Sequence, residues 1–325
     1  MLFLSLIFAV IPIVAYLIIL WRLDKYDREP IKLIFVHFFW GMTGAVLIGG
    51  FLSFLINKFF ELFVTNKIFV DLFASVLTAP LIEEATKGFF LILTISKRKF
   101  DNLTDGIVYG GSIGLGFGLT ENFLYFFFST STINELLSLA IIRNIFSVSI
   151  HFISTAIFGC FLALSKFKSS REQILYLITG YIIAVFIHSL WNFMVSFDLT
   201  YMFGLIFTII SLILIYGLIQ LSLSFEKNII FYELNDEISN GILKPEYASL
   251  ISNYELRNTK GWIKENLRKD YINTATTLAF RKNQVKNITS EKLKNLYNQE
   301  IEGLRNRLKQ LELEAENLSQ EELKQ

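Results

Sequence analysis

The stretch from Ala79 to Phe90 reads APLIEEATKGFF, and it decides how the rest of the chain is interpreted. Glu83, Glu84 and Lys87 lie inside an apolar run from about residue 69 to 95, which is long enough to cross a bilayer as a helix. An ionisable group at membrane depth costs roughly 2.5–3.5 kcal/mol on insertion scales, so such groups are rare and usually functional. On a helix Lys87 can pair with either glutamate, and a buried ion pair that only holds helices together is the simpler interpretation. The carboxylate left over after pairing favours chemistry.

The composition is that of an all-α polytopic membrane protein. Of 325 residues 53% are hydrophobic, 33 are Phe, and the mean hydropathy is +0.49. The formal charge of +1 gives no indication of a nucleic-acid partner. The lone Cys160 excludes an internal disulfide and a cysteine-based zinc site. The residues after Met1 lack the basic region of a cleavable signal, so they are predicted to be a retained first span.

Seven hydrophobic stretches are predicted to cross the membrane, and loop charges orient them. The predicted spans are residues 2–20, 33–57, 69–95, 106–128, 135–164, 173–196 and 202–224. Basic residues follow spans one, three and five: Arg22, Lys25, Arg28 and Lys32, then Lys97, Arg98 and Lys99, then Lys166, Lys168 and Arg171. The alternate loops hold only Lys58 and Lys67. Because cytoplasmic loops carry an excess of Lys and Arg, the N-terminus is predicted to be outside and the C-terminal tail in the cytoplasm.

The composition changes abruptly after residue 225. Residues 1–225 are predicted to form the membrane domain, and 226–325 a polar, helical cytoplasmic tail. An apolar stripe over 297–318 alternates spacings of four and three, which is typical of a coiled coil and equally of a helix packed on its own tail. The tail could therefore serve self-association or bind a cytoplasmic partner.

The fourth span carries a glycine stripe and a further carboxylate. Gly106, Gly110, Gly114 and Gly118 recur every four residues, and Asn122 falls on the same stripe. Such a face lets two helix backbones approach closely. Packing does not explain Glu121, which lies in the middle of the same apolar helix.

The polar residues of four spans are predicted to lie at one depth. At 1.5 Å per residue, Glu83 and Glu84 lie roughly 18–20 Å above the cytoplasmic edge, and Glu121, His151 and His188 roughly 20–23 Å. Arg143 shares the helix of His151, and Asn192 lies one turn after His188. Four helices that place polar groups at one level indicate one site.

These residues, in chain order, resemble the motifs of the PrsW family of intramembrane proteases, which is related to the CAAX-processing and bacteriocin-immunity proteases. The motifs are Glu83-Glu84-x-x-Lys87, Asp105-Gly106-x-x-Tyr109-Gly110, Gly116-Phe117-x-x-x-Glu121-Asn122, Arg143 with His151, and His188-x-x-Trp191-Asn192. The resemblance covers about residues 75–195. It is specific because it needs several motifs in order.

The resemblance implies roles for several of the matched residues. Glu83 and Glu84 would activate water, and His188 with Asn192 would form an oxyanion site. Glu121 stands where the wider group has a histidine. Supporting roles fall to Lys87, Asn122 and Arg143.

The chemistry stays open between two mechanisms. A zinc ion could be held by His151 and His188 with Glu121 and Glu84 or Glu83, because imidazole and carboxylate are ligands that zinc accepts. Alternatively, Glu83 works as a base without a metal. The number of available ligands favours the metalloprotease.

Three functions compete at this point. The first is an intramembrane endopeptidase that cuts near the outer half of the bilayer, and the family's role in releasing anti-sigma factors implies a single-span membrane protein as substrate and a bacterial cell membrane as location. The second is a proton-coupled transporter or channel, against which no inverted repeat or paired broken helices are evident. The third is a catalytically silent scaffold.

Overall fold

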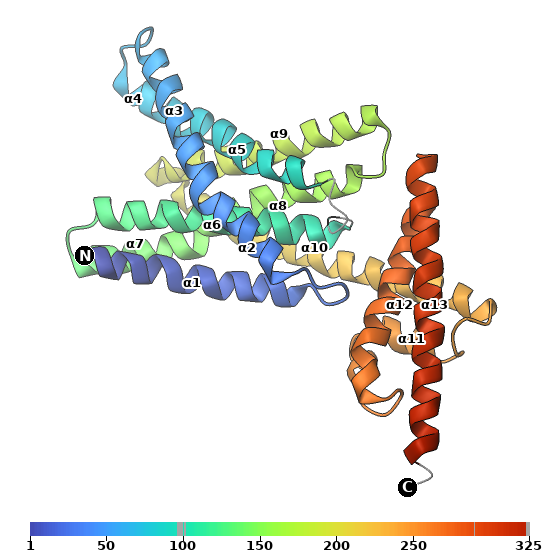
Figure 1. Cartoon of the computed structure of the whole chain (residues 1–325). Helices are drawn as coiled ribbons and strands as arrows, with labels where there is room; N and C mark the ends of the chain where they lie inside the picture. Colours follow the sequence, from blue (N-terminus) through green and yellow to red (C-terminus); the bar gives the residue numbers. More distant parts are fainter. Residues whose placement is uncertain (96–99, 101, 289, 323–325) are drawn as a thin grey trace. The chain divides into compact units, whose positions relative to one another are not determined.

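Helices make up all the regular structure of the described part of the chain. The computed structural model describes residues 1–95, 100, 102–288 and 290–322 (Figure 1). The loop Lys97–Lys99, on which part of the topology prediction rests, lies outside these residues. Within them there is no strand, which confirms the all-α fold class.

Seven helical rods follow the predicted spans, and three of them contain a π-helical turn. The rods are α1 (Leu2–Leu23); α2 (Ile31–Trp40), η1 (Gly41–Ala45) and α3 (Val46–Glu61); α4 (Lys67–Phe73), η2 (Ala74–Thr78) and α5 (Ala79–Thr94); α6 (Leu103–Ser129); α7 (Ile133–Ile142), η3 (Arg143–Ser147) and α8 (Val148–Ser165); α9 (Ser170–Val195); and α10 (Asp198–Ser239). A π turn widens the helix locally and is frequent at functional sites.

Five of the rods in the described residues are long and apolar enough to cross a membrane. They cover Leu2–Leu23, Ile31–Glu61, Ile133–Ser165, Ser170–Val195 and Asp198–Ser239. The other two rods, Lys67–Thr94 and α6, hold the three site glutamates and the glycine stripe, which make them less apolar. A count of seven crossings stays a prediction.

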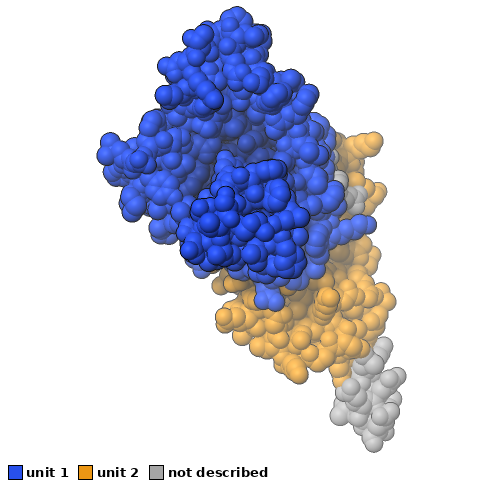
Figure 2. All heavy atoms as spheres, turned by 90° about the vertical axis from the view of Figure 1, so that its left-hand side faces the viewer, with its two compact units in different colours: residues 1–24, 29–166, 170–219 blue, residues 25–28, 167–169, 220–325 orange. Residues whose placement is uncertain are grey.

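The chain divides into two compact units (Figure 2). Unit 1 comprises Met1–Asp24, Glu29–Lys166 and Ser170–Ile219, and unit 2 comprises Lys25–Arg28, Phe167–Ser169 and Gln220–Gln325. The boundary predicted from composition, after residue 225, lies within α10.

Helix α6 is the centre of unit 1, and its glycine stripe lies directly against α8. A Cβ built on Gly106 would lie 2.4 Å from the Gly159 carbonyl oxygen, and one on Gly114 would lie 2.2 Å from the His151 carbonyl oxygen. On another face, a Cβ on Gly116 would lie 2.1 Å from the Phe38 carbonyl oxygen of α2. The predicted close approach of backbones along the stripe is confirmed.

Unit 2 is a helical domain with its own apolar core. Besides the end of α10 it contains α11 (Tyr247–Ser252), η4 (Leu256–Asn258), α12 (Glu265–Val285) and α13 (Glu291–Glu322). Ile301, Leu308 and Leu311 of the apolar stripe are buried in this core, around Tyr271. The stripe therefore packs on the chain's own tail in this structure.

Candidate active site

Glu84 is a fully buried carboxylate that binds donors from three helices. On α5 itself, Lys87 Nζ donates to Oε1 at 2.8 Å. From α8, Ser154 Oγ donates to Oε1 at 3.0 Å and Thr155 Oγ1 donates to Oε2 at 3.2 Å. From α9, His188 Nδ1 lies 2.9 Å from Oε1. With both oxygens engaged, Glu84 is suited to hold its neighbours in place.

Lys87 is the buried cation of the site. Its Nζ lies 3.1 Å from His151 Nδ1 and 4.0 Å from the centre of the Phe117 ring. The ring face attracts the ammonium, and the carboxylate of Glu84 balances its charge. Because an ammonium can only donate, His151 Nδ1 accepts this hydrogen bond.

Glu121 binds the other nitrogen of His151. His151 Nε2 donates to Glu121 Oε2 at 2.7 Å, and Arg143 Nη2 donates to the same oxygen at 2.6 Å. The Arg143 guanidinium also stacks 3.7 Å from the centre of the Tyr125 ring. Both nitrogens of the His151 ring are therefore fixed, and Glu121 is the carboxylate that orients it.

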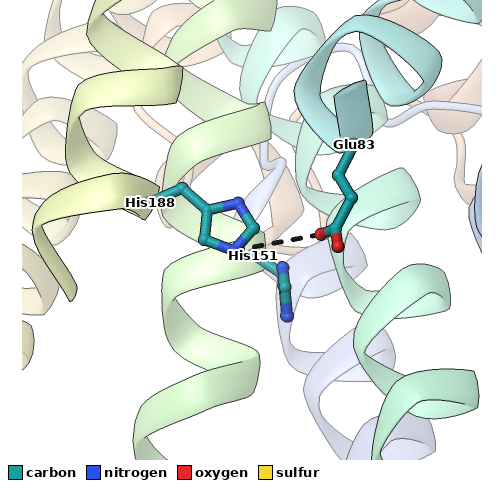
Figure 3. Close-up of side chains that lie close together, drawn as sticks. All are labelled: Glu83, His151 and His188. Atoms are coloured by element: carbon teal, nitrogen blue, oxygen red, sulfur yellow. Dashed lines mark ion pairs between the residues drawn. The ribbon is translucent and has the colours of Figure 1, made fainter. Parts of the chain in front are cut away.

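Glu83 differs from the other two glutamates. Its Oε2 is buried and accepts no hydrogen bond among the described residues. The same atom lies 3.7 Å from Lys87 Nζ and 3.9 Å from His188 Nε2. Because the Nδ1–H of His188 is donated to Glu84, the lone pair of Nε2 is left on the Glu83 side of the ring. Figure 3 shows the carboxylate of Glu83 facing the two histidine rings.

Glu83, His151 and His188 could hold a metal ion. Each offers one ligand atom, and the three atoms lie within 4.8 Å of one another. An oxygen of Glu83 without a hydrogen-bond donor, and a histidine that donates its other N–H to a carboxylate, as His188 does to Glu84, are both typical of such a site. Glu84 and Glu121, which the sequence offered as ligands, are outside this group. His151 would bind a metal through Nδ1, which then has to give up the hydrogen bond from Lys87.

A network beside the site connects it to α1. Arg143 Nε donates to Asn122 Oδ1 at 2.9 Å, and Asn122 Nδ2 donates to Asn144 Oδ1 at 3.0 Å. Asn144 Nδ2 in turn donates to the Phe8 carbonyl at 3.0 Å. The predicted support from Asn122 and Arg143 thus takes the form of direct hydrogen bonds around Glu121.

Asn192 is bonded away from the carboxylates. Its Nδ2 donates to the Ser75 carbonyl of η2 at 2.8 Å. The oxyanion role that the resemblance implies for Asn192 stays a prediction. Sequence reasoning missed Ser154, Thr155 and Asn144. The spacing of two of them offered a signal. Ser154 and Thr155 follow His151 by three and four residues and share its helix face.

The fold and the site together define a class of protein. It is a helical membrane protein in which glutamates, histidines and a lysine from several apolar helices meet in one buried cluster. A protein-family profile described as PrsW family intramembrane metalloprotease matches residues 29–218. That is more than half of the chain, so the chain belongs to the PrsW family.

Individual relatives support the same assignment. The chain is 28% identical over 186 residues to Protease PrsW of Bacillus subtilis (strain 168), covering 57% of this chain and 79% of the relative. It is 28% identical over 216 residues to Protease PrsW of Clostridioides difficile (strain 630), covering 64% and 85%. It is 31% identical over 188 residues to Protease PrsW of Oceanobacillus iheyensis, covering 57% and 80%. No solved structure matches the chain.

Proposed function

We propose that this chain is an intramembrane metalloprotease whose reaction centre is formed by Glu83, His151 and His188. The observation that carries the proposal is the convergence of these three side chains from α5, α8 and α9, with their ligand atoms within 4.8 Å of one another. Family membership supports hydrolysis of a peptide bond as the reaction. Exposed fractions of 15% for Glu83 and 25% for Glu121 show that the described residues do not enclose these two side chains completely.

The residues of the site divide into those that would hold zinc and those that orient them. Glu83, His151 and His188 would be the ligands, and zinc there would supply a Lewis acid that polarises a carbonyl and activates water. Glu84 fixes His188 by accepting its Nδ1–H, and Glu121 orients His151 from the other side. A carboxylate that accepts the N–H of a metal-binding histidine makes that histidine a stronger ligand.

A second mechanism is supported by the position of Lys87. Its ammonium lies 3.7 Å from Glu83 Oε2 and 3.1 Å from His151 Nδ1, so a positive charge already lies where a metal ion would add another. In this mechanism Glu83 Oε2 takes a proton from the attacking water and later gives it to the leaving amine. The ammonium of Lys87 faces the Glu83 carboxylate and would balance its negative charge.

Metal analysis together with cleavage rates distinguishes the two mechanisms. Under the first, purified protein should contain close to one zinc per chain. Replacing His151 or His188 with alanine should remove both the metal and the cleavage of a single-span reporter. Under the second, no metal is found and a chelator does not change the rate. Both mechanisms need the Glu83 carboxylate. If the Glu83→Gln variant cleaves the reporter at the wild-type rate, the proposed centre is therefore wrong.

The proposed substrate is a single-span membrane protein of the anti-sigma-factor type, cut near the outer half of the bilayer. The depth of the glutamates supports the position of the cut. The kinship with proteins named Protease PrsW supports proteolysis, and the substrate class comes from the motif resemblance alone. Mass spectrometry of the products from a reporter with one span should place the cut on the outer side of the bilayer centre. Cleavage only of a soluble peptide would contradict this substrate class.

We also propose that all seven rods cross a bacterial cell membrane, with the N-terminus outside and the C-terminus in the cytoplasm. The asymmetry of Lys and Arg between alternate loops supports this orientation. In a Cys160→Ala background, a cysteine at Ser131 should react with an impermeant thiol reagent in intact cells, and one at Ser169 should not. The opposite pattern would reverse the topology.

A further inference from the structure

Two prolines inside apolar helices each remove a backbone donor. Pro12 lies inside α1, and an α-helix would bond the N–H of residue 12 to the carbonyl of Phe8. Proline has no N–H, so this carbonyl lacks its helical partner. Asn144 Nδ2 from η3 donates to it at 3.0 Å.

Pro80 has the same effect at the start of α5. Within η2 the N–H of Ala79 bonds to the Ala74 carbonyl, five residues back. The next bond of this π register would join residue 80 to the Ser75 carbonyl, and Pro80 cannot make it. Asn192 Nδ2 from α9 donates to the Ser75 carbonyl at 2.8 Å instead.

Each asparagine lies close to one histidine of the centre. Asn192 follows His188 by one turn of α9, and its acceptor precedes Glu83 by about two turns of the rod. Asn144 is next to Arg143, which binds the same Glu121 oxygen as His151. An unsatisfied carbonyl in a bilayer costs several kcal/mol, so both amides are held firmly on their acceptors.

We propose that Asn192 is a positioning residue: by bonding the carbonyl that Pro80 frees, it fixes α9 on η2 and so places His188 against Glu84 and Glu83. Asn144 is a positioning residue in the same sense. By bonding the carbonyl that Pro12 frees, it fixes the neighbouring Arg143, which binds Glu121, and Glu121 in turn orients His151. The inference rests on the proposed function for its catalytic meaning, and its hydrogen bonds can be tested without any assay of cleavage.

The first test is a set of double-mutant cycles on thermal stability. Asn192→Ala should lower the unfolding midpoint by roughly 2–8 °C, because it orphans the Ser75 carbonyl. Adding Pro80→Ala should restore most of the loss, since the new N–H can bond to that carbonyl. Asn144→Ala should likewise lower the unfolding midpoint, and adding Pro12→Ala should restore most of that loss. The mismatched pairs, Asn192→Ala with Pro12→Ala and Asn144→Ala with Pro80→Ala, should be additive. Additivity in the matched pairs would overturn the proposal.

The second test reads the histidines directly. The chain has three histidines, so the ¹⁵N resonances of their rings can be assigned by replacing each in turn. Asn192→Ala should shift the His188 nitrogens and leave those of His151 nearly unchanged, and Asn144→Ala should do the reverse. Cleavage by Asn192→Ala should fall in kcat with little change in KM. A fall in kcat without any change at His188 would instead assign Asn192 to direct contact with the substrate. If the shifts occur in a protein that cleaves nothing, the positioning holds and the protease assignment fails.

Discussion

The glutamate pair of α5 and the ion-pair cluster of unit 2 are two buried charge clusters built for different purposes. In unit 2 the Glu237 side chain is fully buried, and Arg305 donates to both of its oxygens, at 2.8 and 2.6 Å. Lys282 adds a third contact to this carboxylate. In unit 1 Glu84 is saturated in the same way, whereas its neighbour Glu83 keeps a buried oxygen that no donor reaches among the described residues.

The comparison separates a carboxylate whose oxygens are all bonded from one that keeps an open oxygen. A buried carboxylate that only stabilises a fold gains most when every oxygen is bonded, because desolvation is then offset. A carboxylate that must take a proton or bind a metal needs an open oxygen. The protein must then tolerate the free-energy cost of burying that oxygen without a hydrogen bond. Glu83 meets that requirement, and Glu84 and Glu237 do not.

The largest effect should come from Glu83→Gln. Since the amide cannot act as a base or as an anionic ligand, cleavage should fall on the order of a hundred- to ten-thousand-fold. The unfolding midpoint should stay the same or rise, because an uncharged amide is cheaper to bury. Reporter cleavage and thermal unfolding of the same preparation measure both. A large loss of stability would show that Glu83 is structural, like Glu237.

Glu84→Gln should reduce both stability and cleavage. It leaves Lys87 without its bonded carboxylate, which costs about 3–5 kcal/mol when one partner of a buried pair is removed. The amide oxygen can still accept the Nδ1–H of His188, but it holds the ring without a negative charge, so cleavage should fall too. Denaturant titration with parallel rate measurements tests this, and a variant that is stable but inactive would place Glu84 with Glu83.

Glu237→Gln should reduce the stability of unit 2 alone. Removing the charge leaves Arg305 and Lys282 with a weaker partner, at a cost of about 3 kcal/mol. Limited proteolysis should then cut residues 247–316 sooner than in the wild type. The cleavage rate per folded molecule should not change, and a strong fall would mean that unit 2 controls the site.

Thr155→Val should have the smallest effect. It removes one of four donors to Glu84 and keeps the side-chain shape, so it should cost about 1 kcal/mol and leave cleavage within about tenfold of wild type. Ser154→Ala is the matched variant on the other oxygen. A thousand-fold fall in either variant would show that Glu84 tolerates no loss of its donors.

The sequence was sufficient to predict the helices and the meeting of the glutamates with His151 and His188. Both follow from hydrophobic length and from the rise per residue, which are local properties. The different hydrogen bonding of Glu83 and Glu84 could not be predicted, because they lie four and three residues before Lys87 and either can pair with it. What separates them is contact with Ser154 and Thr155, about 70 residues away.

Other features depend on hydrogen-bond register, which hydrophobic periodicity does not reveal. The π turns η1, η2 and η3 replace bonds between residues four apart with bonds between residues five apart, and no apolar pattern in the sequence marks where this occurs. The bond from Asn192 to the Ser75 carbonyl needs one of these turns and a proline from a different stretch of chain. In the tail, the same apolar stripe fits a coiled coil or a core, and only the burial of Leu308 and Leu311 distinguishes them.

Backbone contact between α6 and α8 determines which parts of the site can move. At Gly106 and Gly159 a carbonyl oxygen lies where any larger residue would place its Cβ, so these helices cannot slide past each other without a clash. Glu121 and His151 therefore belong to a fixed wall. Glu83 and His188 lie on α5 and α9, which a side-chain hydrogen bond joins at η2. The two halves of the site are thus joined by different means, α6 and α8 by backbone contact, and α5 and α9 by a side-chain hydrogen bond at η2.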